Sequence, residues 1–174
     1  LQITAAIAVT ADGGYDLLYR EQVDRPWQKL LHWDADDEGE ISDFSQDNQT
    51  LYLIAFGSVN TRCLIALNLQ TNQKNIIAID DRSDLELVVS HPTTRQIQAI
   101  AFYQEKLQWQ ILDPSIAQDF EALALVRPGE INPIDRDLAD KKWLIAYHSD
   151  NAPNYYYIYD RESKLSKLLF CDRP

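Results

Sequence analysis

A tripeptide that returns at a nearly constant interval constrains the fold of this chain more than any other feature. Ile54-Ala55-Phe56 recurs as Ile100-Ala101-Phe102 and as Ile145-Ala146-Tyr147, at spacings of 46 and 45 residues. A fainter copy, Ile7-Ala8-Val9, precedes the first by 47 residues. Periods of about 20 to 50 residues are typical of repeat architectures, in which each unit buries its apolar face against a neighbour. The spacing therefore predicts four copies of one structural unit.

Further short apolar runs surround each copy of the tripeptide. One run precedes the tripeptide and ends in a polar turn, a third closes on Asn or Asp, and a fourth follows after another turn. The first runs occupy 41–44, 85–89 and 131–134, the third runs 64–68, 109–113 and 155–160, and the fourth runs 75–79, 120–126 and 167–170. The first unit supplies only three runs, at 3–9, 15–20 and 28–33, so its first strand is missing.

These runs have the composition of β-strands. Each is four to eight residues long, rich in branched and aromatic residues and bounded by Asn, Asp, Gly, Pro or Ser, which is typical of strands joined by hairpins. Four strands in about 45 residues match one blade of a β-propeller. We therefore predict an all-β fold: a partial β-propeller of about four consecutive blades, each a four-stranded antiparallel sheet, with the first incomplete. The predicted blades span 1–34, 40–79, 85–126 and 131–170 of a single domain.

Glycine is too scarce to form most of the predicted turns. The chain has five glycines, and Asn is among the few other residues that tolerate the left-handed backbone conformation. We therefore expect Asn and Asp to occupy the turn positions, as in the segments 46–48 and 70–73.

Charge excludes several classes of partner. The chain carries 16 basic and 27 acidic residues, a net charge of −11 at pH 7, and such a field repels nucleic acid and anionic membranes. No apolar run is long enough to cross a bilayer, and residues 1–12 lack the pattern of a signal peptide. These observations predict a cytoplasmic protein with neither a nucleic-acid nor a membrane partner.

The sequence favours no metal or cofactor site. The acidic run 34–40 resembles the first half of a calcium-binding EF-hand loop, but Ser45 stands at the twelfth position, where a bidentate Glu is needed. A solvated connection between blades is the interpretation we prefer. His32, His91 and His148 lie in three different units, so ordinary strand-end histidines are expected there.

Four charged residues are candidates for the side of the propeller channel. Functional side chains of a rigid scaffold gather where its innermost strands end or in the adjacent loops. This rule selects Asp43, Glu86, Asp135 and Arg136. Solvation of strand ends is the alternative interpretation, and one sequence does not separate the two.

Several segments resemble a known family of peptidases. The phrases at 142–147, 148–150, 156–162, 168–170 and 173–174 resemble the last propeller blade of the prolyl oligopeptidase family, on its dipeptidyl aminopeptidase and acylaminoacyl peptidase branch. The phrases at 27–30, 32–34, 43–47 and 51–52 are similar to the preceding blades of the same family. The resemblance covers the entire chain.

This resemblance implies a function without catalysis in the chain itself. In that family the propeller caps an α/β-hydrolase domain with a Ser, Asp and His triad, which would begin after residue 174. None of the five glycines forms the G-x-S-x-G elbow of such a nucleophile. The resemblance therefore implies a gating, substrate-selecting propeller segment of a serine peptidase. Its partners would be the C-terminal hydrolase domain and short peptides, whose α-amino group would suit the carboxylates at the channel. A TolB-like propeller scaffold for protein–protein interaction, with no peptidase in the parent, is the alternative.

Open ends of the blade array predict self-association. Four consecutive blades leave one sheet face bare at each end, and large exposed apolar patches are rare on soluble monomers. The expected faces are formed by Ala5, Ile7, Val9, Leu17 and Tyr19 at one end and by Tyr155, Tyr157, Tyr159 and Leu168 at the other. We expect a homodimer through these open blade faces, because two-fold pairing is the commonest closed symmetry.

Overall fold

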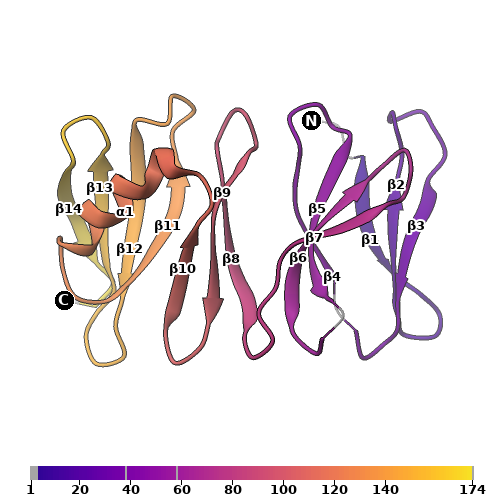
Figure 1. Cartoon of the computed structure of the whole chain (residues 1–174), viewed down its shortest axis with the longest axis horizontal. Coiled ribbons are helices and arrows are strands. Elements are labelled where there is room, and N and C mark those ends of the chain that lie inside the picture. The colour runs from indigo at the N-terminus through magenta and orange to yellow at the C-terminus, as the bar shows by residue number, and fades with distance from the viewer. Residues whose placement is uncertain (1–3, 38, 58, 174) are drawn as a thin grey trace. The chain divides into compact units, whose positions relative to one another are not determined.

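A computed structural model describes residues 4–37, 39–57 and 59–173. Within these residues the chain forms four antiparallel sheets, each made of strands consecutive in sequence (Figure 1). The chain divides into two compact units, Leu1–Leu85 and Glu86–Pro174. The four sheets confirm the predicted all-β fold, and each copy of the repeated tripeptide lies in a strand.

The first unit holds two sheets. The first sheet contains β1 (Ala5–Val9), β2 (Tyr15–Tyr19) and β3 (Gln28–Trp33), and the second contains β4 (Gly39–Phe44), β5 (Thr50–Phe56), β6 (Arg62–Asn68) and β7 (Lys74–Ala78). Their shared core includes Leu17, Leu51, Leu53 and Leu67, all fully buried. The expectation that Leu17 lies on a bare face is wrong, because this side chain packs against the second sheet.

The second unit holds the other two sheets. The third sheet contains β8 (Asp84–Ser90), β9 (Ile97–Tyr103) and β10 (Leu107–Ile111), and the fourth contains β11 (Glu130–Arg136), β12 (Lys142–His148), β13 (Tyr155–Asp160) and β14 (Leu165–Cys171). Trp143, Ile145 and Tyr159 of the fourth sheet form a core with Ala99 of the third. Large aromatic side chains thus fill the space between the two sheets.

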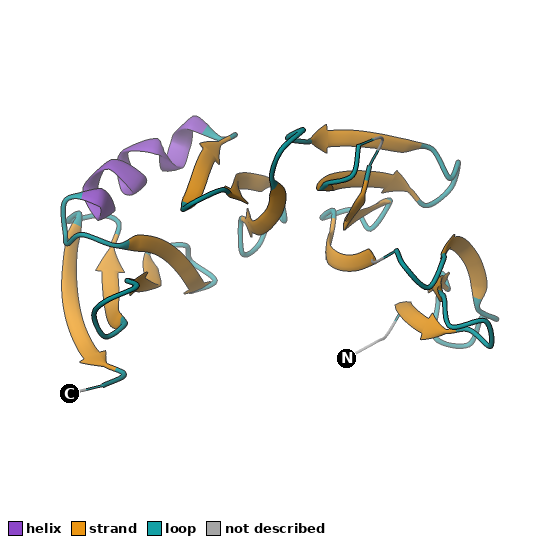
Figure 2. Ribbon diagram, turned by 90° about the horizontal axis from the view of Figure 1, so that it is seen from below, coloured by secondary structure: helices purple, strands orange, loops and turns teal. Residues whose placement is uncertain are grey.

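A helix replaces the strand predicted at residues 120–126. After a short 3₁₀-helix, η1 (Pro114–Ile116), the chain forms α1 (Ala117–Ala124), which Figure 2 shows along one side of the strands of the second unit. The start has a local cause, since the Asp113 carboxylate accepts a hydrogen bond from the backbone N–H of Ser115 and proline is favoured at the first helical position. Helix α1 has eight residues, and no helix among the described residues is long and apolar enough to span a membrane.

The helical period explains the error in that prediction. Ile116, Phe120 and Leu123 recur at intervals of four and three residues, so they fall on one face of a helix, and all three are buried in the core of the second unit. A short apolar run of this kind fits either a strand or a helix. The third sheet consequently has three strands within the described part of the chain.

Asparagine occupies the left-handed position in the segments 46–48 and 70–73, as predicted from the scarcity of glycine. Asn48 and Asn72 have φ values of 56° and 57°. Arg95 and Asp140 adopt the same conformation, with φ values of 59° and 53°, in the turns between β8 and β9 and between β11 and β12. The repeat is therefore visible in the backbone of the turns as well as in the strands.

The tyrosines of β13 face the opposite way from that expected. Tyr159 is fully buried, and Tyr157 packs against the same core. Tyr156 lies on the other face of the sheet, where its ring stacks on that of Phe170 with centroids 4.6 Å apart. The expected bare face through Tyr157 and Tyr159 is therefore wrong, and the open face of the fourth sheet carries Tyr156, Ile158 and Phe170.

Candidate functional site

The four predicted channel residues have different surroundings. Arg136 is almost completely buried, and its backbone N–H donates to the carboxylate of Asp135 at 2.7 Å. Glu86 is exposed on β8. Asp43 lies in the first unit, where its carboxylate accepts a hydrogen bond from the N–H of Phe44 at 2.8 Å. A role in binding substrate stays a prediction for all four.

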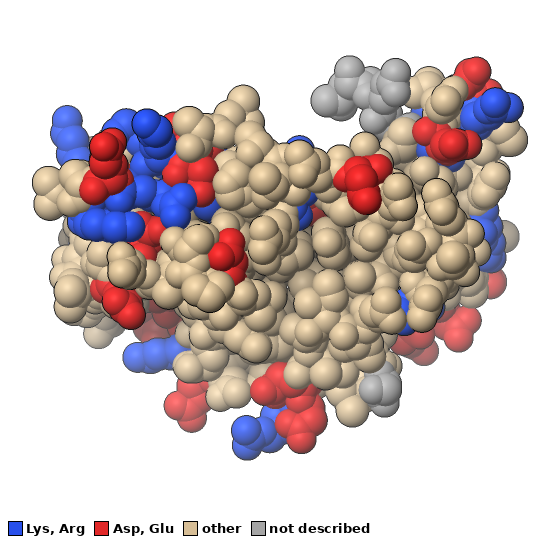
Figure 3. Space-filling model, turned by 45° about the horizontal axis from the view of Figure 1, so that its top comes forward, with Lys and Arg blue, Asp and Glu red and all other residues tan. Residues whose placement is uncertain are grey.

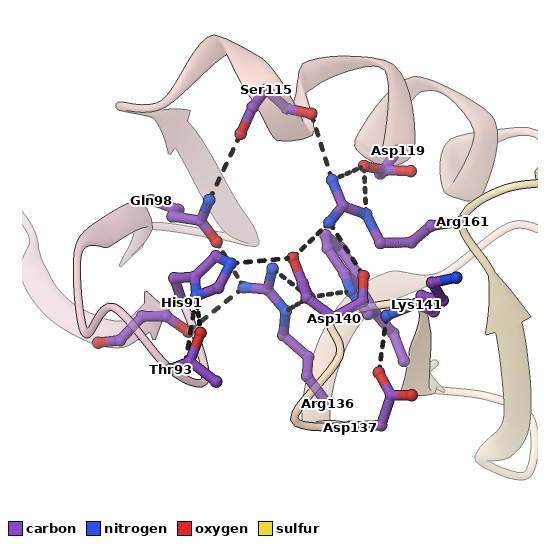
Figure 4. Close-up of polar contacts among 12 residues, drawn as sticks. His91, Thr93, Gln98, Ser115, Asp119, Arg136, Asp137, Asp140, Lys141 and Arg161 are labelled. Atoms are coloured by element: carbon purple, nitrogen blue, oxygen red, sulfur yellow. Dashed lines mark hydrogen bonds and ion pairs between the residues drawn. The ribbon is translucent and has the colours of Figure 1, made fainter.

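Arg136 belongs to a group of charged side chains, which we call the ion cluster. It comprises Asp119 of α1, Arg136 at the end of β11, Asp140 in the following turn, and Arg161 and Lys164 between β13 and β14. Figure 4 shows Arg136 and Arg161 converging on Asp140. The cluster thus joins the helix to both hairpin turns at one end of the fourth sheet.

Asp140 receives hydrogen bonds from two sides. Nε of Arg136 donates to its Oδ1 at 2.6 Å, and the indole Nε1 of Trp143 donates to the same oxygen at 2.9 Å. Arg161 pairs with its Oδ2 and also donates to its backbone carbonyl at 3.0 Å. Asp140 thus binds donors from the end of β11, from β12 and from the turn after β13.

Asp119 is the second anionic centre and has no exposed surface. Its Oδ2 accepts from Nε of Arg161 at 2.9 Å, and its Oδ1 accepts from the hydroxyl of Tyr159 at 2.8 Å and pairs with Lys164. Burial alone would raise the pKa of Asp119, but the donors Lys164, Arg161 and Tyr159 outweigh that effect and lower its pKa. Burial raises the pKa of Tyr159, and the hydrogen bond to the Asp119 carboxylate raises it further. Asp119 is therefore held as an anion beside a neutral tyrosine.

The indole ring of Trp143 also contacts both arginines. The guanidinium carbons of Arg136 and Arg161 lie 4.3 and 5.1 Å from its ring centroid. Burial lowers the pKa of Arg136, although hydrogen bonding to Asp140 opposes this. Cation–π attraction and ion pairing thus act together to offset the cost of removing these charges from water.

The third sheet is tied to the cluster through Gln98. The side-chain oxygen of Gln98 accepts from Nη1 of Arg136 at 2.7 Å, and its nitrogen donates to Asp113 at 2.7 Å. Nδ1 of His91 accepts from the backbone N–H of Thr93 at 3.2 Å, so the ring hydrogen resides on Nε2, which lies 3.8 Å from Asp140. These contacts link the third sheet, the helix and the fourth sheet.

The pairing of charges within the ion cluster suits a structural role. Each of its three cations is paired with the carboxylate of Asp119 or Asp140. Figure 3 shows basic atoms gathered among acidic ones over the second unit, at the left of that view.

Among the described residues no group of three or more His, Cys, Asp or Glu side chains is arranged to hold a metal ion. Within the acidic run 34–40, Glu38 lies outside the described residues.

Sequence reasoning found Arg136 but missed the other members of the cluster. Asp119 pairs with Arg161 and Lys164, which lie 42 and 45 positions later in the sequence. No local sequence pattern predicts such distant contacts. One signal was available, since Asp119 falls on the apolar helical face formed by Ile116, Phe120 and Leu123. Assigning 120–126 to a strand concealed that face.

Comparison with known proteins identifies a relative of this chain among the peptidases. No family model matches the sequence. Dipeptidyl aminopeptidase BIII of Pseudoxanthomonas mexicana is 32% identical over 165 residues, which cover 94% of this chain and 24% of that enzyme. This chain thus spans about a quarter of that relative's length.

Solved structures support the fold. A structure from a study of two prolyl endopeptidases matches with a TM-score of 0.65 at 10% identity, covering 95% of this chain and 24% of that one. TolB from Acinetobacter baumannii matches with a TM-score of 0.63 at 14% identity, covering 96% of this chain and 40% of that one. At such low identities these two matches show the fold alone. The strands and turns of this chain resemble those of the prolyl oligopeptidase family, and a dipeptidyl aminopeptidase is 32% identical to it. This chain therefore belongs to the prolyl oligopeptidase family and forms part of a β-propeller.

Proposed function

We propose that this chain is a non-catalytic propeller segment of a serine peptidase that cleaves short peptides. Its task is to restrict access and select substrates for an α/β-hydrolase domain located C-terminal to it. The observation that carries this proposal is the 32% identity to a dipeptidyl aminopeptidase over 94% of the chain, joined to the blade-like sheets of the structure.

A gate of this kind needs blades that stay together. The ion cluster supports such a role, because Arg161 joins helix α1 to the fourth sheet through Asp119, and Arg136 joins the fourth sheet to the third through Gln98. Charged groups buried with full pairing fix one arrangement of neighbouring elements, since separating them leaves charges without partners. A propeller braced in this way would admit small peptides and exclude large ones.

Size selectivity in the full-length protein tests the proposal. We would compare cleavage of a dipeptide anilide with cleavage of oxidised insulin B chain, in the native protein and in Asp119→Asn. The variant loosens α1 from the fourth sheet, so the rate on the long peptide should rise relative to the dipeptide anilide, whose kcat/KM stays unchanged. Lys142→Gln, which removes an exposed ion pair with Asp160, is the matched control. An unchanged ratio in Asp119→Asn, despite a lowered melting temperature, would argue against gating.

A binding scaffold is the second candidate, favoured by the match to TolB, 40% of which this chain covers. The two candidates differ in the region of the gene that lies beyond the propeller. A G-x-S-x-G elbow, with Asp and His after it, within about 100 to 200 residues of the propeller supports the peptidase. Its absence from the complete gene would favour the scaffold.

A further inference from the structure

The third sheet has an open edge. The second and fourth sheets each contain four strands, but in the third sheet β10 pairs with β9 on one side only, and no strand in the described part of the chain pairs with its other side. Helix α1 comes next in sequence, and its Phe120 ring contacts that of Trp109 with centroids 5.0 Å apart. An unpaired strand edge presents a row of backbone donors and acceptors to an incoming strand.

The hairpin geometry shows which backbone groups face this edge. The N–H of Gln104 donates to the carbonyl of Lys106 at 3.2 Å, which makes Tyr103 and Leu107 a non-hydrogen-bonded pair. Alternation along the register then turns the N–H and C=O groups of Leu107 and Trp109 away from β9. The backbone N–H of Leu107 indeed donates outward, to Oε1 of Glu130 at 3.2 Å.

A cavity of about 380 Å³ lies beside this part of the edge. Residues 106–109 line one side, and residues 128–131 and 148–150 line the rest. The Glu130 carboxylate inside it already accepts the hydrogen bond that a strand carbonyl would accept from Leu107. Glu130 therefore takes, at this cavity, the place of one acceptor of a fourth strand.

We propose that this cavity binds a short extended peptide, which adds to β10 as a fourth strand of the third sheet and places a basic side chain near Glu130 and Asp150. Backbone pairing supplies the affinity in such strand addition, and side-chain pockets supply the selectivity. The lining carries these two carboxylates against one cation, Lys106, and the chain as a whole has a net charge of −11. Charge complementarity thus selects a basic peptide, and this proposal does not rest on the peptidase function.

Backbone methylation of a probe peptide provides the sharpest test. The probe is acetyl-Thr-Lys-Val-Lys-Thr-amide, titrated into the chain while backbone amide signals are followed by NMR. Shifts should concentrate at residues 106–109, 129–131 and 148–150. Successive amides of a strand point to opposite sides, so methylating one central amide should weaken binding at least about tenfold, the equivalent of one lost hydrogen bond. Methylating the adjacent amide should leave binding unchanged.

Equal affinity of the two methylated peptides would overturn strand addition, and shifts confined to other surfaces would overturn the location. Charge is tested separately with Asp150→Asn, which should weaken binding by roughly threefold, as expected for one partly exposed charge pair. Asp172→Asn, which lies outside the cavity, is the control and should bind as the native chain does. A probe with Glu in place of both Lys residues that binds equally well would overturn the basic specificity.

Discussion

The hydroxyl group of Tyr159 donates a 2.8 Å hydrogen bond to the carboxylate of Asp119, 40 positions earlier in the sequence. This contact fixes helix α1 against β13, and Arg161 and Lys164 complete the shell around the same carboxylate. Because the anion has no exposed surface, each donor that it loses leaves a buried charge less well solvated. The position of the helix in the second unit therefore depends on this carboxylate.

Asp119→Asn should destabilise the protein by about 3 kcal/mol, the usual scale for removing one member of a buried ion pair. The variant leaves two cations near an uncharged amide. Urea unfolding followed by far-UV circular dichroism measures the change, with Lys142→Gln as the control at an exposed ion pair. A midpoint for Asp119→Asn equal to that of the control would contradict the structural role of the cluster.

Alkaline pH should weaken the folded state through its buried tyrosines. Burial raises the pKa of both Tyr147 and Tyr159 above the ordinary value of 10.0. The stability that these groups contribute is fully present below pH 10 and is lost as the pH rises above 10 through their folded-state pKa values. Unfolding midpoints between about pH 8 and 11 should fall less steeply in Tyr159→Phe than in the native protein. Tyr103→Phe, at a half-exposed ring, should retain the native slope, and identical slopes in all three proteins would refute this prediction.

Helix α1 offers a matched pair of core and surface positions. Phe120 is 8% exposed and contacts Trp109 and Trp143, whereas Leu125, just beyond the helix, is 88% exposed. Phe120→Ala should cost about 3 to 5 kcal/mol through the cavity that it creates. Leu125→Ala should change the free energy of unfolding by less than about 0.5 kcal/mol. Similar losses for the two variants would show that the helix does not pack as described.

Self-association remains a prediction, now assigned to a different face. The open side of the fourth sheet carries Phe170, which is 55% exposed and stacks on Tyr156, and Leu165, which is 69% exposed, at the other end of β14. If two copies pair through this face, sedimentation at ~100 μM should reveal a dimer that strengthens as salt screens the acidic chain. Phe170→Glu should yield a monomer, and Leu138→Glu, at an exposed turn residue, should not. A native chain that stays monomeric at every salt concentration would contradict the prediction.

The repeat made the four sheets predictable, because strand period and turn residues are local properties of the sequence. Asn48 and Asn72 adopt the left-handed turns that the scarcity of glycine requires. Residues 120–126 were assigned wrongly because Phe120 and Leu123 fit either period, and tertiary packing decides between them. The ion cluster could not be predicted from the sequence for a similar reason, because the contact of Asp119 with Tyr159 depends on which face of β13 turns inward.

Serine labelling of the full-length protein tests the central claim most directly. A fluorophosphonate probe reacts with an activated serine, and mass spectrometry of the digested protein identifies the labelled peptide. We predict that the label lies C-terminal to residue 174 and that the isolated chain takes up none. A labelled serine within residues 1–174 would contradict the account of this chain as a non-catalytic propeller segment.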